Sequence, residues 1–258
     1  MQRTRTIPPT QPARTIPIAP TQHTIMQSIL LHLLPGVLIA IVFFSTAPLA
    51  QQWRLPPFIA QCFADLVVLV PSVLGCLCYQ GYRMYGHLAL DGVVLYRDRL
   101  PWRQFAWLVP VILIAIGGLT MLLAPLGTWI FSQFFAWLPD MFLTATDLHG
   151  YSRSTLISSY LIFILMIVFT APILEELYFR GYLLPRMACF GIWAPVIHSV
   201  LFALYHVWSP WLAIGRAFSV FLLVVMVQWK RNIYLGMAAH ILGNSVDAIA
   251  GMLFILQQ

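Results

Sequence analysis

Long apolar runs, separated by short polar loops, account for most of this chain. A helix needs roughly 20 predominantly apolar residues to cross the ~30 Å hydrocarbon core of a bilayer. Seven runs reach or approach that length, at residues 28–50, 57–80, 105–126, 155–184, 188–206, 211–229 and 233–255. The pattern therefore predicts an all-α fold, a polytopic transmembrane helix bundle of about seven spans.

One further stretch, 127–143, is apolar and aromatic but is broken by Pro139 and Asp140. It fits an interfacial helix, and it also fits part of an eighth, re-entrant membrane element. The number of spans is therefore predicted as seven or eight.

The composition favours a membrane protein over a soluble one. Residues of the AVILMFWYC set make up 60% of the chain and charged residues 9%, whereas soluble domains run near half apolar and about a quarter charged. So few charged residues cannot build a solvated surface. The four cysteines form no CxxC pair, and we interpret them as buried thiols in or beside apolar runs. They are Cys62, Cys76, Cys78 and Cys189.

The distribution of positive charge predicts how the chain is oriented. Residues 1–27 form a basic, Pro-rich tail without acidic residues, and we predict that this tail is disordered. With the N-terminus in the cytoplasm, ten Lys and Arg residues lie inside, and only Arg54 and Arg153 lie outside. The positive-inside rule favours this orientation. The net charge of +6 then reflects cytoplasmic flanks and anionic headgroups rather than nucleic acid.

Three ionisable residues, Glu175, Glu176 and Arg180, fall inside the fourth predicted span. A charged residue near the bilayer centre costs about 2.5–3.5 kcal/mol on insertion scales, so such residues are functional candidates. Glu176 and Arg180 are four residues apart and are expected to pair on one helix face. Glu175 points about 100° away and is left without a partner. A free second carboxylate indicates more than a structural ion pair.

Two later spans supply polar groups at helical spacing. A lone histidine on an apolar helix is more often a packing residue, but here two histidines, an amide and a free carboxylate lie on three helices. At 1.5 Å per residue they all fall roughly 14–22 Å deep, in the membrane interior. We therefore predict one shared polar site. Its later members are Phe202 and His206, with His198 on the same stripe, and His240 and Asn244, with Asp247 a further turn along.

The polar residues of the fourth, fifth and seventh predicted spans together resemble the motifs of the CPBP family. This family groups the type II CAAX prenyl endopeptidases with Abi-like bacterial homologues. The resemblance covers about residues 155–256 and implies that 151–258 is the catalytic transmembrane core, preceded by N-terminal spans and loops at 28–150. The family motifs EExxxR, FxxxH and HxxxN stand here as Glu175, Glu176 and Arg180, as Phe202 and His206, and as His240 and Asn244.

The resemblance implies an intramembrane endopeptidase with a polar cavity. A carboxylate away from bulk water is a usable base, since burial raises its pKa, and an amide donates to an oxyanion without adding charge. Carried over by position, Glu175 and His206 would activate water, His240 and Asn244 would stabilise the oxyanion, and Glu176 with Arg180 would hold the site, with Phe202 in support.

Two mechanisms remain open for this site. We favour a metal-free glutamate mechanism that needs no cofactor. The alternative is a Zn²⁺ ion held by Glu175, His206 and His240, with water in the open position. No HExxH sequence is present, which excludes the common soluble zinc-protease pattern but not a site built on three helices.

Other classes of protein also fit parts of the pattern. A non-catalytic member of the CPBP fold, with an immunity or scaffold role, is the main alternative. A proton-coupled transporter would use Asp65, Arg216 and Asp247 with the histidines, and a haem protein would use His206 and His240 as axial ligands. Asp65, Arg216 and Asp247 have no assigned role; Arg216 is a candidate partner for either acid.

The expected partners are the lipid bilayer and a membrane-anchored or lipidated protein or peptide substrate, with no nucleic acid. Prenylated C-termini, leader peptides and sorting tails remain equal candidates for that substrate. The short chain without an organelle address favours a bacterial inner (plasma) membrane.

Overall fold

The computed structural model describes residues 20–143, 148 and 150–257, and most of the predicted tail, 1–19, lies outside them. No β-strand occurs among these residues, and a lone antiparallel bridge joins Arg97 to Asn232. The predicted all-α class is confirmed. The helices are α1 (Ile25–Gln52), α2 (Phe58–Ala64), α3 (Val70–Tyr85), α4 (Trp102–Phe134), α5 (Arg153–Phe163), α6 (Ala171–Glu175), α7 (Ala194–Tyr205), α8 (Ala213–Lys230) and α9 (Ile233–Gln257).

Shorter helical segments connect several of these helices without a break in direction. π-Helical segments lie at Asp65–Leu69, Ile164–Thr170 and Glu176–Leu183, and 3₁₀ segments at Asp140–Phe142, Leu184–Trp193 and Pro210–Leu212. Two of the π-helical segments flank α6. The stretch 153–183, which we call the motif helix, therefore departs from regular α-helical hydrogen bonding on both sides of Glu175.

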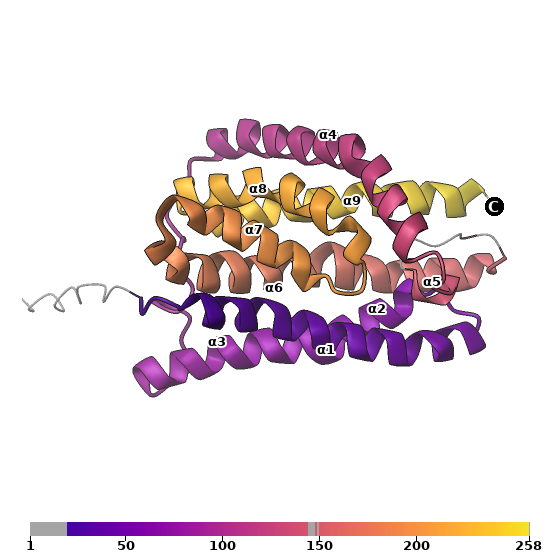
Figure 1. Ribbon diagram of the computed structural model, residues 1–258, viewed down its shortest axis with the longest axis horizontal. Coiled ribbons are helices and arrows are strands. Elements are labelled where there is room, and N and C mark those ends of the chain that lie inside the picture. The colour runs from indigo at the N-terminus through magenta and orange to yellow at the C-terminus, as the bar shows by residue number, and fades with distance from the viewer. Residues whose placement is uncertain (1–19, 144–147, 149, 258) are drawn as a thin grey trace, which may run out of the picture.

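Six helical stretches are long and apolar enough to cross a membrane. The longest, Arg153–Tyr205, contains two of the predicted spans. It reverses direction near Gly191, whose backbone (φ 56°, ψ −130°) is not helical and suits a residue without a Cβ. The predicted spans 155–184 and 188–206 are thus two antiparallel arms of one helical stretch, and α7 runs back along the motif helix (Figure 1).

The third predicted span is longer than expected. The helix α4 continues past residue 126 to Phe134, with Pro110 and Pro125 inside it. The first half of 127–143 is therefore an extension of this span, and the described part of the second half contains only a short 3₁₀ turn, Asp140–Phe142. The two prolines inside α4 therefore do not end the helix.

The bundle places the motif helix at its centre. In Figure 1, α1 and α3 lie along one side, α4 lies along the opposite side, and α6, α7, α8 and α9 lie between them. One large cluster of buried side chains joins these helices and includes Phe43, Phe179, Phe202 and Tyr205. The polar motif residues are therefore held inside the apolar core rather than on its surface.

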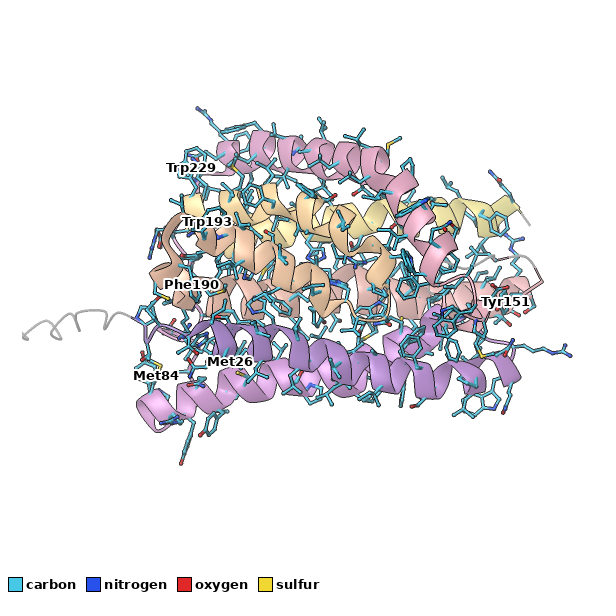
Figure 2. The ribbon with its side chains drawn as sticks, viewed as in Figure 1. Met26, Met84, Tyr151, Phe190, Trp193 and Trp229 are labelled. Atoms are coloured by element: carbon cyan, nitrogen blue, oxygen red, sulfur yellow. The ribbon has the colours of Figure 1, made fainter. Side chains whose placement is uncertain are left out.

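The outer surface is apolar over its length and aromatic at its ends. Ile114 and Met121 on α4 are 75% and 79% exposed. Figure 2 shows Trp193 and Trp229 at one end of the bundle and Tyr151 at the other. Aromatic side chains at both ends of an apolar band are typical of the two membrane–water interfaces.

The loop between α3 and α4 ties two motif-bearing elements together. The N–H of Leu95 donates to the Gly181 carbonyl at 2.8 Å, and the N–H of Ile233 donates to the Tyr96 carbonyl at 2.7 Å. Two consecutive loop residues, Leu95 and Tyr96, thereby contact the end of the motif helix and the start of α9. The N-terminal half of the chain thus helps to set the relative position of these two helices.

The four cysteines are free, and their burial differs from the prediction. Cys62 is buried, Cys76 and Cys78 are half-buried, and Cys189 is exposed. The prediction of a buried thiol is wrong for Cys189, because this residue lies in the 3₁₀ segment at the end of the bundle, where its N–H donates to Gln22.

Candidate functional site

The first motif lies where the motif helix changes from α to π geometry. Glu175 is the last residue of α6, and Glu176 opens the π-helical segment Glu176–Leu183. Both are buried, with exposed fractions of 6% and 0%. π-Helical turns within helices are frequent at functional sites, because they change the direction in which consecutive side chains point.

Glu176 belongs to a closed, buried ion pair. Its Oε1 lies 3.2 Å from Nη1 of Arg180, and both side chains are almost fully inaccessible to solvent. The guanidinium carbon of Arg180 lies 3.9 Å from the centre of the Phe202 ring, a cation–π contact. The predicted pairing of Glu176 with Arg180 is confirmed, and Phe202 provides the face against which the arginine packs.

A glycine on α9 makes room for this pair. A Cβ atom at Gly236 would collide with Oε2 of Glu176. The absence of a side chain at this position lets α9 approach the motif helix closely. Gly236 stands one turn before His240, so the same close approach brings the histidine against the glutamates. This residue carries no motif letter, and no spacing in the sequence identifies it.

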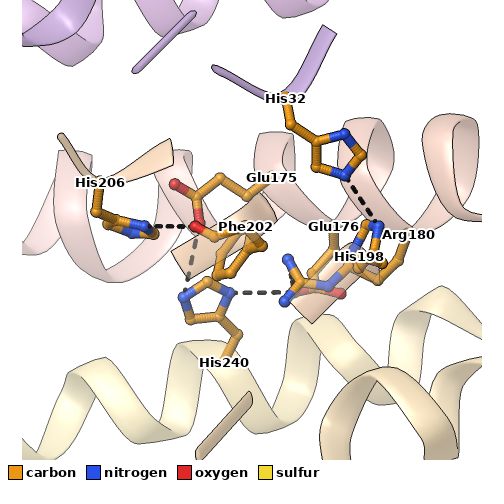
Figure 3. A network of polar contacts seen from close by, with 8 residues as sticks. All are labelled: His32, Glu175, Glu176, Arg180, His198, Phe202, His206 and His240. Atoms are coloured by element: carbon orange, nitrogen blue, oxygen red, sulfur yellow. Dashed lines mark hydrogen bonds and ion pairs between the residues drawn. The ribbon is translucent and has the colours of Figure 1, made fainter. Parts of the chain in front are cut away.

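His240 connects the paired glutamate to the free one. Its Nδ1 lies 3.2 Å from Oε1 of Glu176, and its Nε2 lies 3.8 Å from Oε2 of Glu175 (Figure 3). The first contact has hydrogen-bond length, whereas the second is longer and joins an imidazole to a carboxylate with no closer ionic partner in the described residues. Glu175 and His240 therefore lie within the reach that a shared site requires.

His206 ends α7 with one ring nitrogen fixed. Its Nδ1 lies 2.9 Å from the carbonyl oxygen of Phe202. A carbonyl only accepts, so Nδ1 carries the proton, and Nε2 of the neutral ring is left as an acceptor. The rings of Phe202, Tyr205 and Trp208 surround it at centroid distances of 5.0, 4.8 and 5.1 Å. In Figure 3 the Glu175 side chain lies between the rings of His206 and His240.

Asn244 holds a backbone carbonyl of the motif helix. Its Nδ2 donates to the Ile167 oxygen at 2.8 Å. This oxygen lacks both helical donors, since the N–H of Ala171 bonds to Met166 and Pro172 has no N–H. Pro172 thus leaves one carbonyl of the motif helix without a helical donor, and Asn244 on α9 satisfies it. One N–H of the amide is used in this way, and the second remains available.

Two other histidines form a separate contact. His198 Nδ1 lies 3.1 Å from Nε2 of His32 on α1, and both rings are fully buried. His32 Nδ1 donates to the Ser28 carbonyl at 2.7 Å. His198 therefore contacts His32 rather than the residues around Glu175, because α7 turns this part of its surface toward α1. His32 stands alone in an apolar span, and no spacing in the sequence identifies it.

The three unassigned charged residues lie in different environments. Asp65 is 4% exposed and accepts a hydrogen bond from Gln61 at 3.0 Å, whereas Asp247 is exposed. Arg216 donates through Nη2 to the Ser209 hydroxyl at 3.2 Å. No ion pair joins it to Asp65 or Asp247, so neither candidate pairing is present.

The three candidate zinc ligands have suitable donor atoms, but their positions do not form a metal site in the described residues. In the part of the chain that the structure describes, no three His, Cys, Asp or Glu side chains converge as a metal site requires. Glu175, His206 and His240 supply ligand types that suit zinc. Nδ1 of His240 lies against Glu176 at 3.2 Å, as the second ring nitrogen of a metal-bound histidine usually lies against a carboxylate, so the types of donor are compatible with zinc.

Comparison with known families identifies the same part of the chain. A model described as type II CAAX prenyl endopeptidase Rce1-like matches residues 157–246. The match contains all three motifs, and the resemblance predicted from them is confirmed. No curated protein and no solved structure shows significant similarity to the chain. With its six apolar helical stretches, the chain is an integral membrane protein.

Proposed function

Because residues 157–246 form an Rce1-like domain of the type II CAAX prenyl endopeptidase family, we propose that the protein is an intramembrane endopeptidase. It hydrolyses a peptide bond of a membrane-anchored protein with water activated by Glu175. The observation that carries this proposal is the difference between the two glutamates. Glu176 is bound by Arg180 at 3.2 Å, whereas the ion-pair contact of Glu175 in the described residues is the longer one to His240, at 3.8 Å.

Glu175 acts as the general base. Its carboxylate takes a proton from a water molecule as the water oxygen attacks the carbonyl carbon of the substrate. The resulting tetrahedral intermediate collapses when the same proton passes to the amide nitrogen and the carbon–nitrogen bond breaks. A new carboxylic acid and an amine are the products. Such positioned proton transfer contributes typically ~10²–10⁴-fold to a rate.

His206 helps to hold the attacking water. Its Nδ1 proton is committed to the Phe202 carbonyl, so Nε2 accepts a hydrogen bond from the water. The rings packed around the imidazole hold it in one orientation, which reduces the entropy lost when the water binds. His206 and Glu175 thus accept the two protons of one water molecule.

His240 and Asn244 stabilise the oxyanion of the intermediate. Nδ1 of His240 lies against Glu176 and its Nε2 faces Glu175, so an N–H on Nε2 points toward the reacting atoms. Asn244 donates the N–H that the Ile167 carbonyl does not use. Removal of one donor of this kind typically lowers kcat by ~10²–10³-fold.

Glu176, Arg180 and Phe202 position the reacting residues. The ion pair holds Oε1 of Glu176 against Nδ1 of His240, which fixes the ring and directs its other nitrogen toward Glu175. In this proposal two adjacent carboxylates have different roles, because one is neutralised by an arginine and the other is not. No cofactor is required.

The family name points to the class of substrate. Its members are described as prenyl endopeptidases of CAAX proteins, so we propose a prenylated or otherwise lipidated protein anchored in the same bilayer. The lipid group would place the peptide at the membrane surface, and the peptide would reach Glu175 inside the bundle.

Cleavage by the purified full chain tests this function. The probe is a fluorescent, S-farnesylated peptide that ends in Cys-Val-Ile-Met, in phosphatidylcholine vesicles with and without a metal chelator. We expect the wild type to release the C-terminal fragment in both conditions, and Glu175→Gln to release none. A wild type that cleaves neither this peptide nor a leader or sorting peptide would favour the scaffold role, and loss of activity with the chelator would contradict the metal-free mechanism.

A further inference from the structure

Tyr205 is a buried tyrosine whose hydroxyl has no regular hydrogen bond. It is the last residue of α7 and stands directly before His206. Its side chain is inaccessible to solvent, and its hydroxyl oxygen forms no hydrogen bond of regular geometry with any described residue. Buried tyrosine hydroxyls usually have a partner. Packing alone does not explain this one, because a phenylalanine would fill nearly the same space without burying a polar atom.

The ring of Tyr205 is held rigidly in place. It packs against the rings of Phe179 and Trp208 at centroid distances of 4.8 and 5.6 Å. On the α1 side, a Cβ atom at Gly36 would collide with the backbone and the ring of Tyr205. The absence of a side chain at Gly36 therefore lets α1 pack closely against the tyrosine. These neighbours fix the direction of the phenol, and its hydroxyl has a defined position in the bundle.

The hydroxyl lies beside the carboxylate that we propose as the general base. The side chain of Glu175 comes within hydrogen-bonding range of Tyr205. A phenol has one proton to donate and an ionised carboxylate only accepts, so in this contact Tyr205 is the donor. Hydrogen bonds to an ionised acceptor are shorter and stronger than those between neutral groups.

Asp65 is a second acid near the same hydroxyl. The π-helical segment Asp65–Leu69 packs against α6, and Asp65 lies within electrostatic range of both Glu175 and Tyr205. Its Oδ1 already accepts a hydrogen bond from Gln61 at 3.0 Å. Glu175 comes within hydrogen-bonding range of the phenol, whereas Asp65 interacts with it only electrostatically. Glu175 is therefore the better acceptor for the phenol proton.

We propose that Tyr205 is a positioning residue for the general base: its hydroxyl donates to one carboxylate oxygen of Glu175 and leaves the other oxygen for the attacking water. The inference rests on the proposed function, because it takes Glu175 as the base. A glutamate side chain has several rotamers, and a hydrogen bond from a rigid ring holds it in the reactive one. Tyr205 stands at an unspecified position of the FxxxH motif, so the motif itself does not require it.

Isotope labelling tests this hydrogen bond without turnover. Glu175 and Glu176 are the only two glutamates in the sequence, so cell-free synthesis with glutamate that carries ¹³C at its side-chain carboxyl labels two groups. The infrared band that Glu175→Gln removes belongs to Glu175. We expect Tyr205→Phe, which keeps the ring and deletes only the hydroxyl, to shift this band in phosphatidylcholine vesicles without substrate. An unshifted band overturns the inference.

Cleavage of the farnesylated peptide described above measures the consequence for the reaction. We expect Tyr205→Phe to lower kcat by roughly 10- to 100-fold, the loss typical of a misplaced reacting group. KM should be unchanged, because the hydroxyl acts on the base and not on the substrate. The unfolding temperature should not fall, since the hydroxyl has no regular hydrogen bond to lose. An unchanged kcat, with or without a lowered unfolding temperature, overturns the inference.

Tyr178→Phe is the matched control. It removes the hydroxyl of another buried tyrosine, which donates to the Leu31 carbonyl at 2.9 Å. Because this hydroxyl holds two helices together, we expect a lowered unfolding temperature, with the Glu175 band and kcat unchanged. If Tyr178→Phe shifts the band and lowers kcat as much as Tyr205→Phe does, the effect is a general one of the packed rings and the inference is wrong.

The variant Asp65→Asn decides between the two possible acceptors. If the hydroxyl acts on Glu175, Tyr205→Phe lowers kcat by the same factor in the Asp65→Asn chain as in the wild type. If Tyr205→Phe has no further effect in that chain, the hydroxyl acts through Asp65 and the inference is overturned.

The outcomes also separate the inference from the proposed function. If Tyr205→Phe shifts the Glu175 band but the wild type cleaves no peptide, the hydrogen bond stands and the protease proposal fails. If the wild type cleaves the peptide and Glu175→Gln does not, while Tyr205→Phe leaves both band and kcat unchanged, the protease stands and the inference is overturned.

Discussion

The two consecutive glutamates of the motif helix occupy opposite kinds of environment. On the Glu176 side every charge is matched: the carboxylate lies 3.2 Å from Arg180, the arginine packs on Phe202, and Gly236 lets α9 close over them. On the Glu175 side the nearest ionic contact is longer, 3.8 Å to a histidine that is 20% exposed. The Glu176 side thus contains a short ion pair, whereas the ionic contact of Glu175 is longer.

This difference shows how a membrane protein can keep a reactive carboxylate inside an apolar bundle. The closed side holds the helices and fixes His240, and its stability allows the open side to remain unpaired. Substitutions on the Glu176 side should therefore mainly lower the free energy of unfolding. Substitutions on the Glu175 side should mainly lower the rate of cleavage.

The largest effect on stability is expected from breaking the closed side. Glu176→Gln leaves the buried charge of Arg180 without its partner, and removing one member of a buried pair typically costs ~3–5 kcal/mol. Thermal unfolding in detergent measures this loss. The matched control is Asp98→Asn, which breaks the ion pair with Arg231 at 3.2 Å, where both side chains are 59% exposed. We expect a change below ~1 kcal/mol there, and equal effects of the two variants would contradict the distinction.

The next largest effect is expected from Asn244, because it both holds a carbonyl of the motif helix and is assigned to the oxyanion. Asn244→Ala removes the donor to the Ile167 carbonyl and the second N–H that we assign to the oxyanion. We expect kcat to fall by ~10²–10³-fold, with a loss in unfolding free energy of only ~0.5–1.5 kcal/mol. Ser245→Ala, which removes a hydroxyl bonded within its own helix, is the control. A kcat loss below tenfold would leave Asn244 with a purely structural role.

The smallest effect is expected from crowding the closed side without removing a charge. Gly236→Ala places a methyl group against Glu176, and overpacking of this kind typically costs ~1–3 kcal/mol. Gly243→Ala lies on the same helix, and its added Cβ would meet only Leu113 at 3.7 Å, an ordinary contact. We expect unfolding of Gly243→Ala near that of the wild type. The close approach of α9 would be of no importance if Gly236→Ala unfolded at the same temperature.

The sequence predicted those parts of the molecule that depend on local spacing. Apolar runs of span length predicted the helices, and the four-residue separation of Glu176 and Arg180 predicted their pair. Both follow from helical geometry within one element. The motif letters also identified three helices that the structure brings together around Glu175, with His240 in contact with both glutamates.

Features that depend on the angle between helices could not be predicted from the sequence. His198 shares a helical stripe with His206, but the orientation of α7 directs it to His32. Gly236 matters only because α9 crosses the motif helix there. The role of Asn244 depends on the π-helical segment before Pro172, and such a shift in hydrogen bonding has no simple periodic signal.

The single-turnover rate of peptide cleavage by Glu175→Gln tests the central claim most directly. The purified variant is saturated with the farnesylated peptide at a temperature where it is fully folded, so the measured rate reports the chemical step alone. We predict a rate at least ~10²-fold below that of the wild type, with peptide affinity and unfolding temperature unchanged. A rate within tenfold of the wild type would show that the free carboxylate does not activate the water.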